Sequence, residues 1–304
     1  MKIPLSITVA FLSCLVLATS AGAAVRHSVS AEESEAARRF WTPGRVADAA
    51  RRDPAFGTIP PAAEASSNGR EPRHRPVNVF RPEVGKILGW DRYGGYSCTG
   101  SVIDTYSLRL VLTAAHCLYY EGQWARRVIF IPNFKNGRRP YGTYKSKALW
   151  VPRQWARLSH GTTGTHLDLG LMVTRKTWNG SRIGEDIGAL PLQFYPDRSG
   201  LTDIYGYPGG AMKARVMRTC RSWTVPWSGG WFMPGPTGMS AWCNMAPGSS
   251  GGPWVSRYKR EDGGSFGVVD GLTSTGGKVG RRSVLTSPYF GRILVNLIRS
   301  TEGG

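Results

Sequence analysis

The chain has 304 residues, enough for one large domain or two small ones with a real apolar core. It carries 39 Lys and Arg against 20 Asp and Glu, a formal net charge of +19. Such an excess suits contact with a polyanion. The basic residues are scattered, however, and no nucleic-acid-binding motif accompanies them. The composition therefore favours a basic secreted protein over a nucleic-acid-binding protein.

Residues 1–23 are predicted to be a secretory signal peptide. Lys2 is followed by an apolar stretch, Ile3–Leu17, and then by small residues, Ala21–Ala23, that suit a cleavage site. The stretch is too short to span a bilayer comfortably, and nothing later in the chain is long enough to be transmembrane. We expect a secreted protein, extracellular or periplasmic.

Residues 24–76 differ in composition from the remainder of the chain. They are rich in Ala, Glu, Arg and Pro and hold few large apolar side chains, so we expect them to bury little. Ser30–Glu33 forms a capping box that predicts a short helix, whereas residues 59–69 have the composition of a linker. The segment is interpreted as a pro-region removed on maturation or, alternatively, as a disordered tether.

Residues 77–304 are predicted to be an all-β body. Short β-branched or apolar runs alternate with turn residues, and no long helical pattern lies between them. This spacing predicts an antiparallel sandwich or barrel rather than a parallel α/β fold. The expected strands are Leu108–Ala114, Val128–Ile131, Ala148–Val151, Leu169–Val173, Asp203–Tyr207, Arg215–Cys220, Phe266–Val269 and Ser283–Thr286.

One helix is expected at the C-terminus. Ser287 suits the N-cap and Pro288 the first turn. The following apolar residues mark one helical face: Phe290, Ile293, Leu294, Leu297 and Ile298.

Three segments carry candidate catalytic residues. Glycines surround Ser250 in Ala246–Trp254 and leave backbone N–H groups free to point at a reacting oxygen. Gly-x-Ser-x-Gly alone is weak evidence, because such residues also form ordinary turns. An apolar run ends at His116, and another begins at Asp168. A serine nucleophile needs an imidazole base and a carboxylate that orients it, so these residues fit the three roles.

The order of these residues separates the folds that use this chemistry. An α/β-hydrolase needs its histidine after the serine, and no histidine follows Ser250. The subtilisin order needs an aspartate before the histidine, but Asp91 and Asp104 lie in no comparable motif. The order histidine, aspartate, serine is that of the chymotrypsin architecture.

Residues 113–117, 168–171 and 248–253 resemble the three catalytic blocks of trypsin/chymotrypsin-like serine proteases. Residues 204–210 resemble the Gly-Tyr-Pro-Gly segment of the bacterial glutamyl endopeptidase branch of that family. The resemblance runs from about Val84 to the C-terminus. It implies two antiparallel six-stranded β-barrels with a cleft between them and a C-terminal α-helix.

The resemblance also implies roles for further residues. The N–H groups of Gly248 and Ser250 correspond to the oxyanion hole, and the strand 271–274 corresponds to the one that pairs with a substrate backbone. Ser274 matches a serine beside the catalytic aspartate. Once Cys14 is removed with the signal, four cysteines allow three pairings. We expect the pairs Cys98–Cys117, as in the family, and Cys220–Cys243, each adding about 3 kcal/mol.

The resemblance predicts no cleavage specificity. Asn244 stands six residues before Ser250, where trypsin-like enzymes carry an aspartate, so cleavage after basic residues is not expected. Thr273 holds the position of the histidine of glutamyl endopeptidases, so Glu specificity is not expected either. Ser249 replaces the aspartate that binds a freed amino terminus in trypsin-like zymogens. We therefore expect activation by uncovering of the cleft or by another N-terminal contact.

Four tryptophans between the second pair of cysteines have two interpretations. They form a wall of the substrate pocket, or they pack the second barrel. They are Trp223, Trp227, Trp231 and Trp242.

The function predicted is that of a secreted, monomeric serine endopeptidase acting on polypeptides through an acyl-enzyme. No cofactor is needed, and no metal is expected because neither Cys-x-x-Cys nor His-Glu-x-x-His occurs. One alternative is an esterase that uses the same three residues. Another is a catalytically silent protease-like module that binds polyanions through its basic surface.

Overall fold

The computed structural model describes residues 23–54, 75–76, 81–158, 162–210, 213–227, 238–245, 247–259, 265–279 and 282–303. Residues 1–22 of the predicted signal peptide lie outside these ranges. The predicted linker at 59–69 and the predicted start of the body at 77 also lie outside them. No described helix is long and apolar enough to cross a membrane.

The first barrel is an antiparallel sheet in the order β9-β10-β5-β4-β3-β8, closed because β8 also pairs with β9. Its strands are β3 (Val84–Asp91), β4 (Gly94–Val102), β5 (Leu110–Thr113), β8 (Arg126–Pro132), β9 (Tyr144–Pro152) and β10 (Gly170–Thr174). The short hairpin β6 (Tyr119–Tyr120) and β7 (Gln123–Trp124) follows the 3-10 helix η1 (Ala115–Cys117). The interior is filled by inward-facing apolar side chains of these strands.

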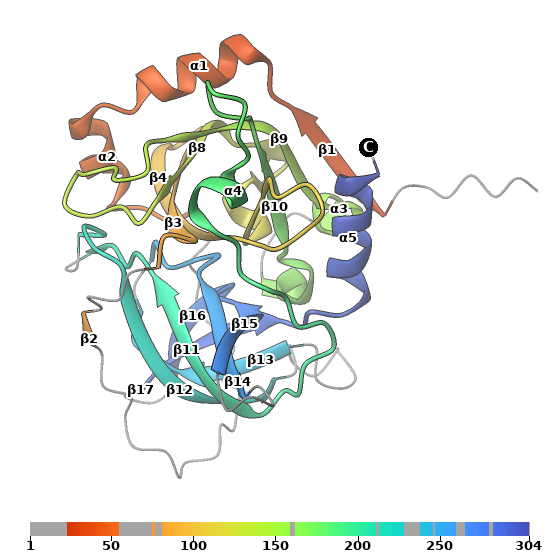
Figure 1. Cartoon of the computed structure of the whole chain (residues 1–304). Helices are drawn as coiled ribbons and strands as arrows, with labels where there is room; N and C mark the ends of the chain where they lie inside the picture. The colour runs from red at the N-terminus through yellow and green to blue at the C-terminus, as the bar shows by residue number, and fades with distance from the viewer. Residues whose placement is uncertain are drawn as a thin grey trace, which may run out of the picture.

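The second barrel is a curved sheet in the order β15-β14-β11-β12-β13-β17-β16, with β2 paired to β12. Its strands are β2 (Arg75–Pro76), β11 (Gly200–Gly206), β12 (Arg218–Trp227), β13 (Gly238–Trp242), β14 (Pro253–Lys259), β15 (Ser265–Leu272), β16 (Thr275–Val279) and β17 (Arg282–Pro288). The two barrels lie one above the other in Figure 1. The predicted all-β fold of two antiparallel barrels is confirmed. The first is the closed six-stranded barrel expected, whereas the second is a half-barrel formed by an eight-stranded sheet.

Helices occupy the connections and the C-terminus. Two segments, α3 (Arg153–Leu158) and the 3-10 helix η2 (Thr162–Leu167), lie between β9 and β10, and α4 (Ile183–Ile187) precedes the second barrel. The C-terminal helix α5 (Arg292–Glu302) lies beside the first barrel in Figure 1. It buries Leu294 and Leu297, as its apolar face predicts.

The predicted start of the C-terminal helix is wrong. Ser287 and Pro288 form the end of β17 and pair with Met239 and Gly238 of β13. The buried Ser287 hydroxyl accepts a hydrogen bond from Leu272 N–H instead of capping a helix. Gly291 is the N-cap residue, so the helix begins four residues later than the Ser-Pro pattern suggests.

All eight predicted strands occur, but several others were not predicted, among them β13, β14 and β16 of the second sheet and β3 and β4 of the first barrel. In β3 and β4, glycines interrupt the alternation of apolar and polar side chains that marks a strand. A side chain of a neighbouring strand fills the space where the glycine's own side chain would lie. A Cβ on Gly85 would lie 2.5 Å from the Phe130 ring, and one on Gly89 would lie 2.2 Å from the Tyr96 hydroxyl. These positions exclude any larger residue.

The N-terminal segment, residues 24–54, is folded onto the first barrel. Strand β1 (Ala24–Ser28) pairs with β9, and the helices α1 (Ala31–Phe40) and α2 (Pro43–Ala49) lie along the outer side of the barrel (Figure 1). The predicted capping box is present at the start of α1. Trp41 and Ala49 are buried in the barrel core, so this segment buries more than its composition led us to expect, and the disordered-tether interpretation does not describe it.

Candidate active site

The first barrel brings His116 and Asp168 together through the pairing of β5 with β10. These strands are antiparallel, with Thr113 opposite Gly170. The end of β5 therefore meets the start of β10, and the residues just outside each strand become neighbours. His116 lies in η1 directly after β5, and Asp168 lies directly after η2 and before β10.

Asp168 holds the imidazole of His116 in place. Its Oδ2 lies 2.8 Å from His116 Nδ1, and its Oδ1 accepts the backbone N–H of His116 at 2.9 Å. The Ser274 hydroxyl of the second barrel donates to Oδ2 at 2.6 Å. Burial alone would raise the pKa of Asp168, but these partners outweigh burial and hold the pKa below its ordinary value. The carboxylate is therefore ionised and fixed in orientation.

Ser250 lies in a tight turn between β13 and β14. Its carbonyl accepts the N–H of Thr99 at 2.8 Å, and the next N–H, of Gly251, donates to Thr273 O at 2.6 Å. Gly251 has φ +79°, and a Cβ there would lie 2.0 Å from Thr113 Oγ1. The turn is thus clamped between the two barrels and requires glycine after the serine.

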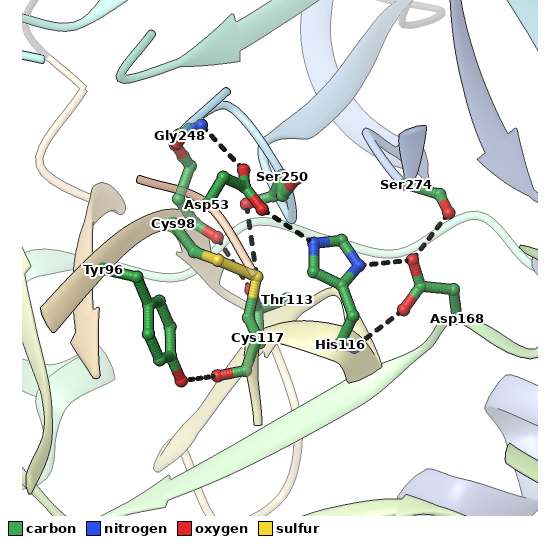
Figure 2. A network of polar contacts seen from close by, with 11 residues as sticks. Asp53, Tyr96, Cys98, Thr113, His116, Cys117, Asp168, Gly248, Ser250 and Ser274 are labelled. Carbon is green, nitrogen blue, oxygen red and sulfur yellow. Dashed lines mark hydrogen bonds and ion pairs between the residues drawn. A yellow bond between two sulfur atoms is a disulfide. The ribbon is translucent and has the colours of Figure 1, made fainter. Parts of the chain in front are cut away.

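Asp53, which the sequence analysis did not identify, occupies the space between the candidate residues. Figure 2 shows its carboxylate between Gly248 and His116. Oδ2 accepts the Gly248 N–H at 2.7 Å, and Oδ1 lies 3.3 Å from His116 Nε2. The Asp53 side chain has no solvent exposure. The buried Ser250 hydroxyl has no hydrogen-bond partner among the described residues.

Asp168 and Asp53 both favour the charged form of the imidazole, and Asp168 has the larger effect. Burial alone would lower the pKa of His116, but the carboxylates of Asp168 and Asp53 together raise it to about 10. The imidazole is therefore protonated at neutral pH in this chain. An imidazolium has no free lone pair, so it cannot accept a proton from Ser250 in this state.

Arg52 holds the neighbouring part of the segment against the first barrel. One guanidinium nitrogen donates to Asp91 Oδ1 at 2.5 Å and to Gly94 O at 2.8 Å. The Arg52 carbonyl accepts the N–H of Ser97 at 3.0 Å. The ring of Tyr96 lies 5.4 Å from the guanidinium carbon. Both the side chain and the backbone of Arg52 are thus fixed beside Asp53.

The residues expected to bind substrate lie in different surroundings. Asn244 is exposed. Thr273 is fully buried, and its hydroxyl accepts the indole N–H of Trp254 at 3.1 Å, so it packs the interior of the second barrel. Of the expected set, Ser274 alone contacts Asp168. Its resemblance to the family's serine is the signal that identified it.

The tryptophans of the second barrel do not share one role. Trp223 is 65% exposed and contributes little to packing, whereas Trp227 is buried in agreement with the packing interpretation. Trp242 is partly buried, and its ring lies under the guanidinium of Arg282. Trp231 lies outside the described residues.

The cysteines form the two expected disulfides, Cys98–Cys117 and Cys220–Cys243. The first joins β4 to the residue after His116. In the described parts of the chain, the group with metal-ligand spacing is Cys98, His116 and Cys117. Because its two sulfurs are bonded to each other, they offer no thiolates, and the group does not fit a metal site.

The sequence matches no protein-family model and no curated protein. Many solved structures share the fold, among them three proteases. A protease, Anisep, from Arthrobacter nicotinovorans is 27% identical, with a TM-score of 0.62 over 73% of this chain and 96% of that chain. A thermostable serine protease, AL20, from an extremophilic microorganism is 25% identical, with a TM-score of 0.63 over 74% and 99%. A Glu endopeptidase is 17% identical, with a TM-score of 0.57 over 76% and 97%.

These structural neighbours are trypsin/chymotrypsin-like serine proteases, as the motifs around the three candidate residues predict. The likeness to the Glu endopeptidase is one of fold. The likeness to Anisep and AL20 supports a hydrolase of the serine protease class.

Proposed function

We propose that this protein is a secreted serine endopeptidase with Ser250 as nucleophile, His116 as base and Asp168 as the residue that orients the base. One observation carries the proposal: a buried Asp168 carboxylate binds both His116 Nδ1 and the Ser274 hydroxyl, and His116 Nε2 points away from Asp168, toward Asp53. This is the arrangement that fixes the tautomer of an imidazole base. The two bacterial proteases of the same fold support the assignment.

The proposed reaction begins when neutral His116 takes the proton of Ser250 through Nε2. The Ser250 oxygen then attacks the peptide carbonyl carbon, and the carbonyl oxygen becomes an oxyanion. In this structure the N–H of Gly248 donates to an anionic oxygen of Asp53. The same donor is expected to bind the oxyanion, together with Ser250 N–H, and such a donor contributes about 3 kcal/mol to transition-state stabilisation.

Collapse of the tetrahedral intermediate breaks the peptide bond. His116 gives its proton to the leaving amine, and the acyl group stays on Ser250. Water, deprotonated by His116, then attacks the acyl carbon. The bond from this carbon to Ser250 Oγ breaks, His116 returns the proton to Ser250 Oγ, and the carboxylate product leaves. Asp168 stabilises the imidazolium during both halves of the reaction.

The test is cleavage of a denatured protein by the chain recovered from the medium of an exporting host and freed of the predicted pro-region, residues 24–76. New peptide termini are identified by mass spectrometry, and an ester with the same acyl group is assayed in parallel. Cleavage is expected for the wild-type chain and for Ser222→Ala, whose hydroxyl donates to Trp223 O and to no other described residue. It is expected to be lost in Ser250→Ala and His116→Ala.

Two outcomes would contradict the proposal. Ester hydrolysis without peptide cleavage would identify an esterase that uses the same residues. Salt-sensitive heparin binding by a folded chain that cleaves neither substrate would identify a catalytically silent polyanion-binding module.

A further inference from the structure

Asp53 makes two contacts with groups on which the proposed reaction depends. One carboxylate oxygen takes the Gly248 N–H, and the other faces His116 Nε2. A buried carboxylate is costly unless charged or hydrogen-bonding partners compensate it. The donor of the candidate oxyanion hole and the candidate base supply these partners, so together they form a binding site for the Asp53 carboxylate.

The same contacts leave the Ser250 hydroxyl without an activating base. Nε2 of His116 faces Asp53, and the buried Ser250 Oγ has no hydrogen-bond partner among the described residues. The protonated imidazole is stabilised by a carboxylate on each side, Asp168 at Nδ1 and Asp53 at Nε2. Asp53 therefore opposes both the geometry and the protonation state that nucleophilic attack requires.

Arg52 provides a second anchor next to Asp53. The Asp91 carboxylate, with only 12% of its side chain exposed, and the carbonyls of Gly94 and Gly95 form a socket for the guanidinium. Because a charge-assisted pair of this kind is directional, it fixes the register of the segment in the cleft. The socket for the guanidinium lies next to the site that binds the Asp53 carboxylate. Two neighbouring sites of this kind suit a basic residue followed directly by an acidic one.

The rest of the segment is held to the first barrel by strand pairing and by a buried tryptophan. Strand β1 pairs with β9 over five residues, from Ala24 opposite Pro152 to Ser28 opposite Ala148. Trp41 is 2% exposed, and its indole N–H donates to Arg127 O at 2.6 Å. These contacts precede Arg52 in the chain, so they deliver Asp53 to the cleft as part of a docked unit.

We propose that the cleft is a binding site for the chain's own N-terminal segment, residues 24–54, and that Asp53 inhibits the enzyme by occupying the space between Gly248 and His116. This inference rests on the proposed function. It also specifies how the cleft is covered before maturation: the ligand is an Arg-Asp pair, with Arg52 in the Asp91 socket and Asp53 at the reaction centre.

The experiment uses the uncut chain, residues 24–304, and three proteins: wild type, Asp53→Ala and Asp48→Ala. Asp48 is a matched aspartate in the same segment, but its side chain is 75% exposed, and among the described residues its one ion pair is with Arg51. Labelling of Ser250 by a fluorophosphonate is followed by intact mass and peptide mapping. The pKa of His116 is measured by NMR, with the resonance assigned from His116→Ala.

Asp53→Ala is expected to be labelled about 10- to 100-fold faster than wild type, the factor that loss of a hydrogen bond to a charged group implies. Its His116 pKa is expected to be lower than that of the wild-type chain, because one of the two flanking carboxylates is gone. Asp48→Ala is expected to match wild type in both measurements. Thermal unfolding of each protein verifies that the segment is still folded.

The outcomes distinguish failure of this inference from failure of the proposed function. Equal, rapid labelling of all three proteins would show a working nucleophile without inhibition and would overturn the inference alone. An unchanged His116 pKa in Asp53→Ala would overturn it whatever the labelling rate. A lower His116 pKa in Asp53→Ala than in wild type, with no labelling of any of the three proteins, would support the Asp53 contact but contradict the proposed function.

Discussion

Asp168 accepts hydrogen bonds from both barrels, so the orientation of His116 depends on Ser274 as well as on the first barrel. The Ser274 hydroxyl is fully buried and donates to the carboxylate oxygen that faces Nδ1. Its removal leaves that oxygen with one partner fewer in a site closed to water. Ser274 is a positioning residue in this account, because it acts through Asp168.

Ser274→Ala is expected to lower kcat by roughly tenfold, the effect of losing one hydrogen bond to a charged group. KM is expected to change little, because Ser274 is bonded to Asp168. Steady-state kinetics with a peptide substrate check this, with Ser222→Ala as the control. An equal loss of kcat in both variants would show a general effect of serine removal instead.

The raised pKa of His116 makes the stability of the uncut chain depend on pH. A folded-state pKa of about 10, above the ordinary value of 6.5, means that the folded chain binds this proton more tightly than the unfolded chain does. The resulting stabilisation is fully present below pH 6.5 and is lost as the pH rises through about 10. Asp168, whose pKa is lowered, contributes a stabilisation that is lost only in acid.

We therefore expect the difference in unfolding free energy between the wild-type chain and His116→Ala to shrink from pH 6.5 to pH 10. Urea unfolding at intervals across this range measures it. Taking the difference between the two proteins cancels the contributions of other groups that titrate in the same range. One such group is the buried Lys86, because burial lowers the pKa of this lysine to about 7. A constant difference would contradict the charge state assigned to His116.

The candidate catalytic residues could be predicted from the sequence because each lies in a local motif. His116 ends an apolar run, Asp168 begins one, and Ser250 is surrounded by glycines. Asp53 could not be predicted, because its chemistry depends on a contact that only the folded segment creates. Nothing in the sequence around Asp53 marks it as a ligand of Gly248 or His116.

At the scale of elements, Trp41 is the residue that most clearly holds the N-terminal segment on the barrel. Its ring lies edge-on to that of Phe40, with ring centroids 5.2 Å apart, and near the ring of Trp90, at 6.4 Å. The Trp41 carbonyl accepts a guanidinium N–H of Arg139 at 2.7 Å. The tryptophan thus joins helix α1, helix α2 and the first barrel.

Trp41→Ala is expected to reduce stability by about 3–5 kcal/mol, as is usual for a buried tryptophan. Because the lost contacts dock the segment, the variant is also expected to react faster with a fluorophosphonate. Urea unfolding and labelling kinetics test both effects. Arg39→Ala, a change in a 64% exposed side chain of the same helix, is the control and is expected to change neither.

Strands with β-branched residues were predictable, whereas glycine-rich strands were not. The periodicity of β8, β9 and β10 comes from side chains of their own. In β4 a Cβ on Gly100 would lie 2.8 Å from Ile87 Cδ1, so the apolar atoms that fill that position belong to another strand. Because the side chain that fills this position lies far away in the sequence, it leaves no local pattern in the glycine-rich strand.

At the scale of the whole molecule, the segment that inhibits is also part of the first barrel's core. It adds β1 to the sheet and contributes Ala37, Trp41, Val46 and Ala49 to the buried cluster. Cutting the chain beyond Pro54 removes none of these contacts. Activation therefore requires the segment to dissociate as well as to be cut.

A chain cut at a protease site engineered between residues 57 and 70 is expected to retain the 24–54 fragment on gel filtration. Ser250 labelling is expected to stay slow until mild denaturant or fragment degradation releases it. Separation of the fragment directly after cutting, with immediate fast labelling, would contradict the account. A chain that carries the inserted site but is left uncut is the control.

The most direct test of the account is a crystal structure of the uncut wild-type chain after complete reaction with a fluorophosphonate. We predict that phosphorus is bonded to Ser250 Oγ and that a phosphonyl oxygen accepts the hydrogen bond from Gly248 N–H that Asp53 accepts in the unreacted chain. The Asp53 carboxylate is then displaced from the space between Gly248 and His116. A phosphonyl group on another residue, or Asp53 unmoved beside a modified Ser250, would contradict it.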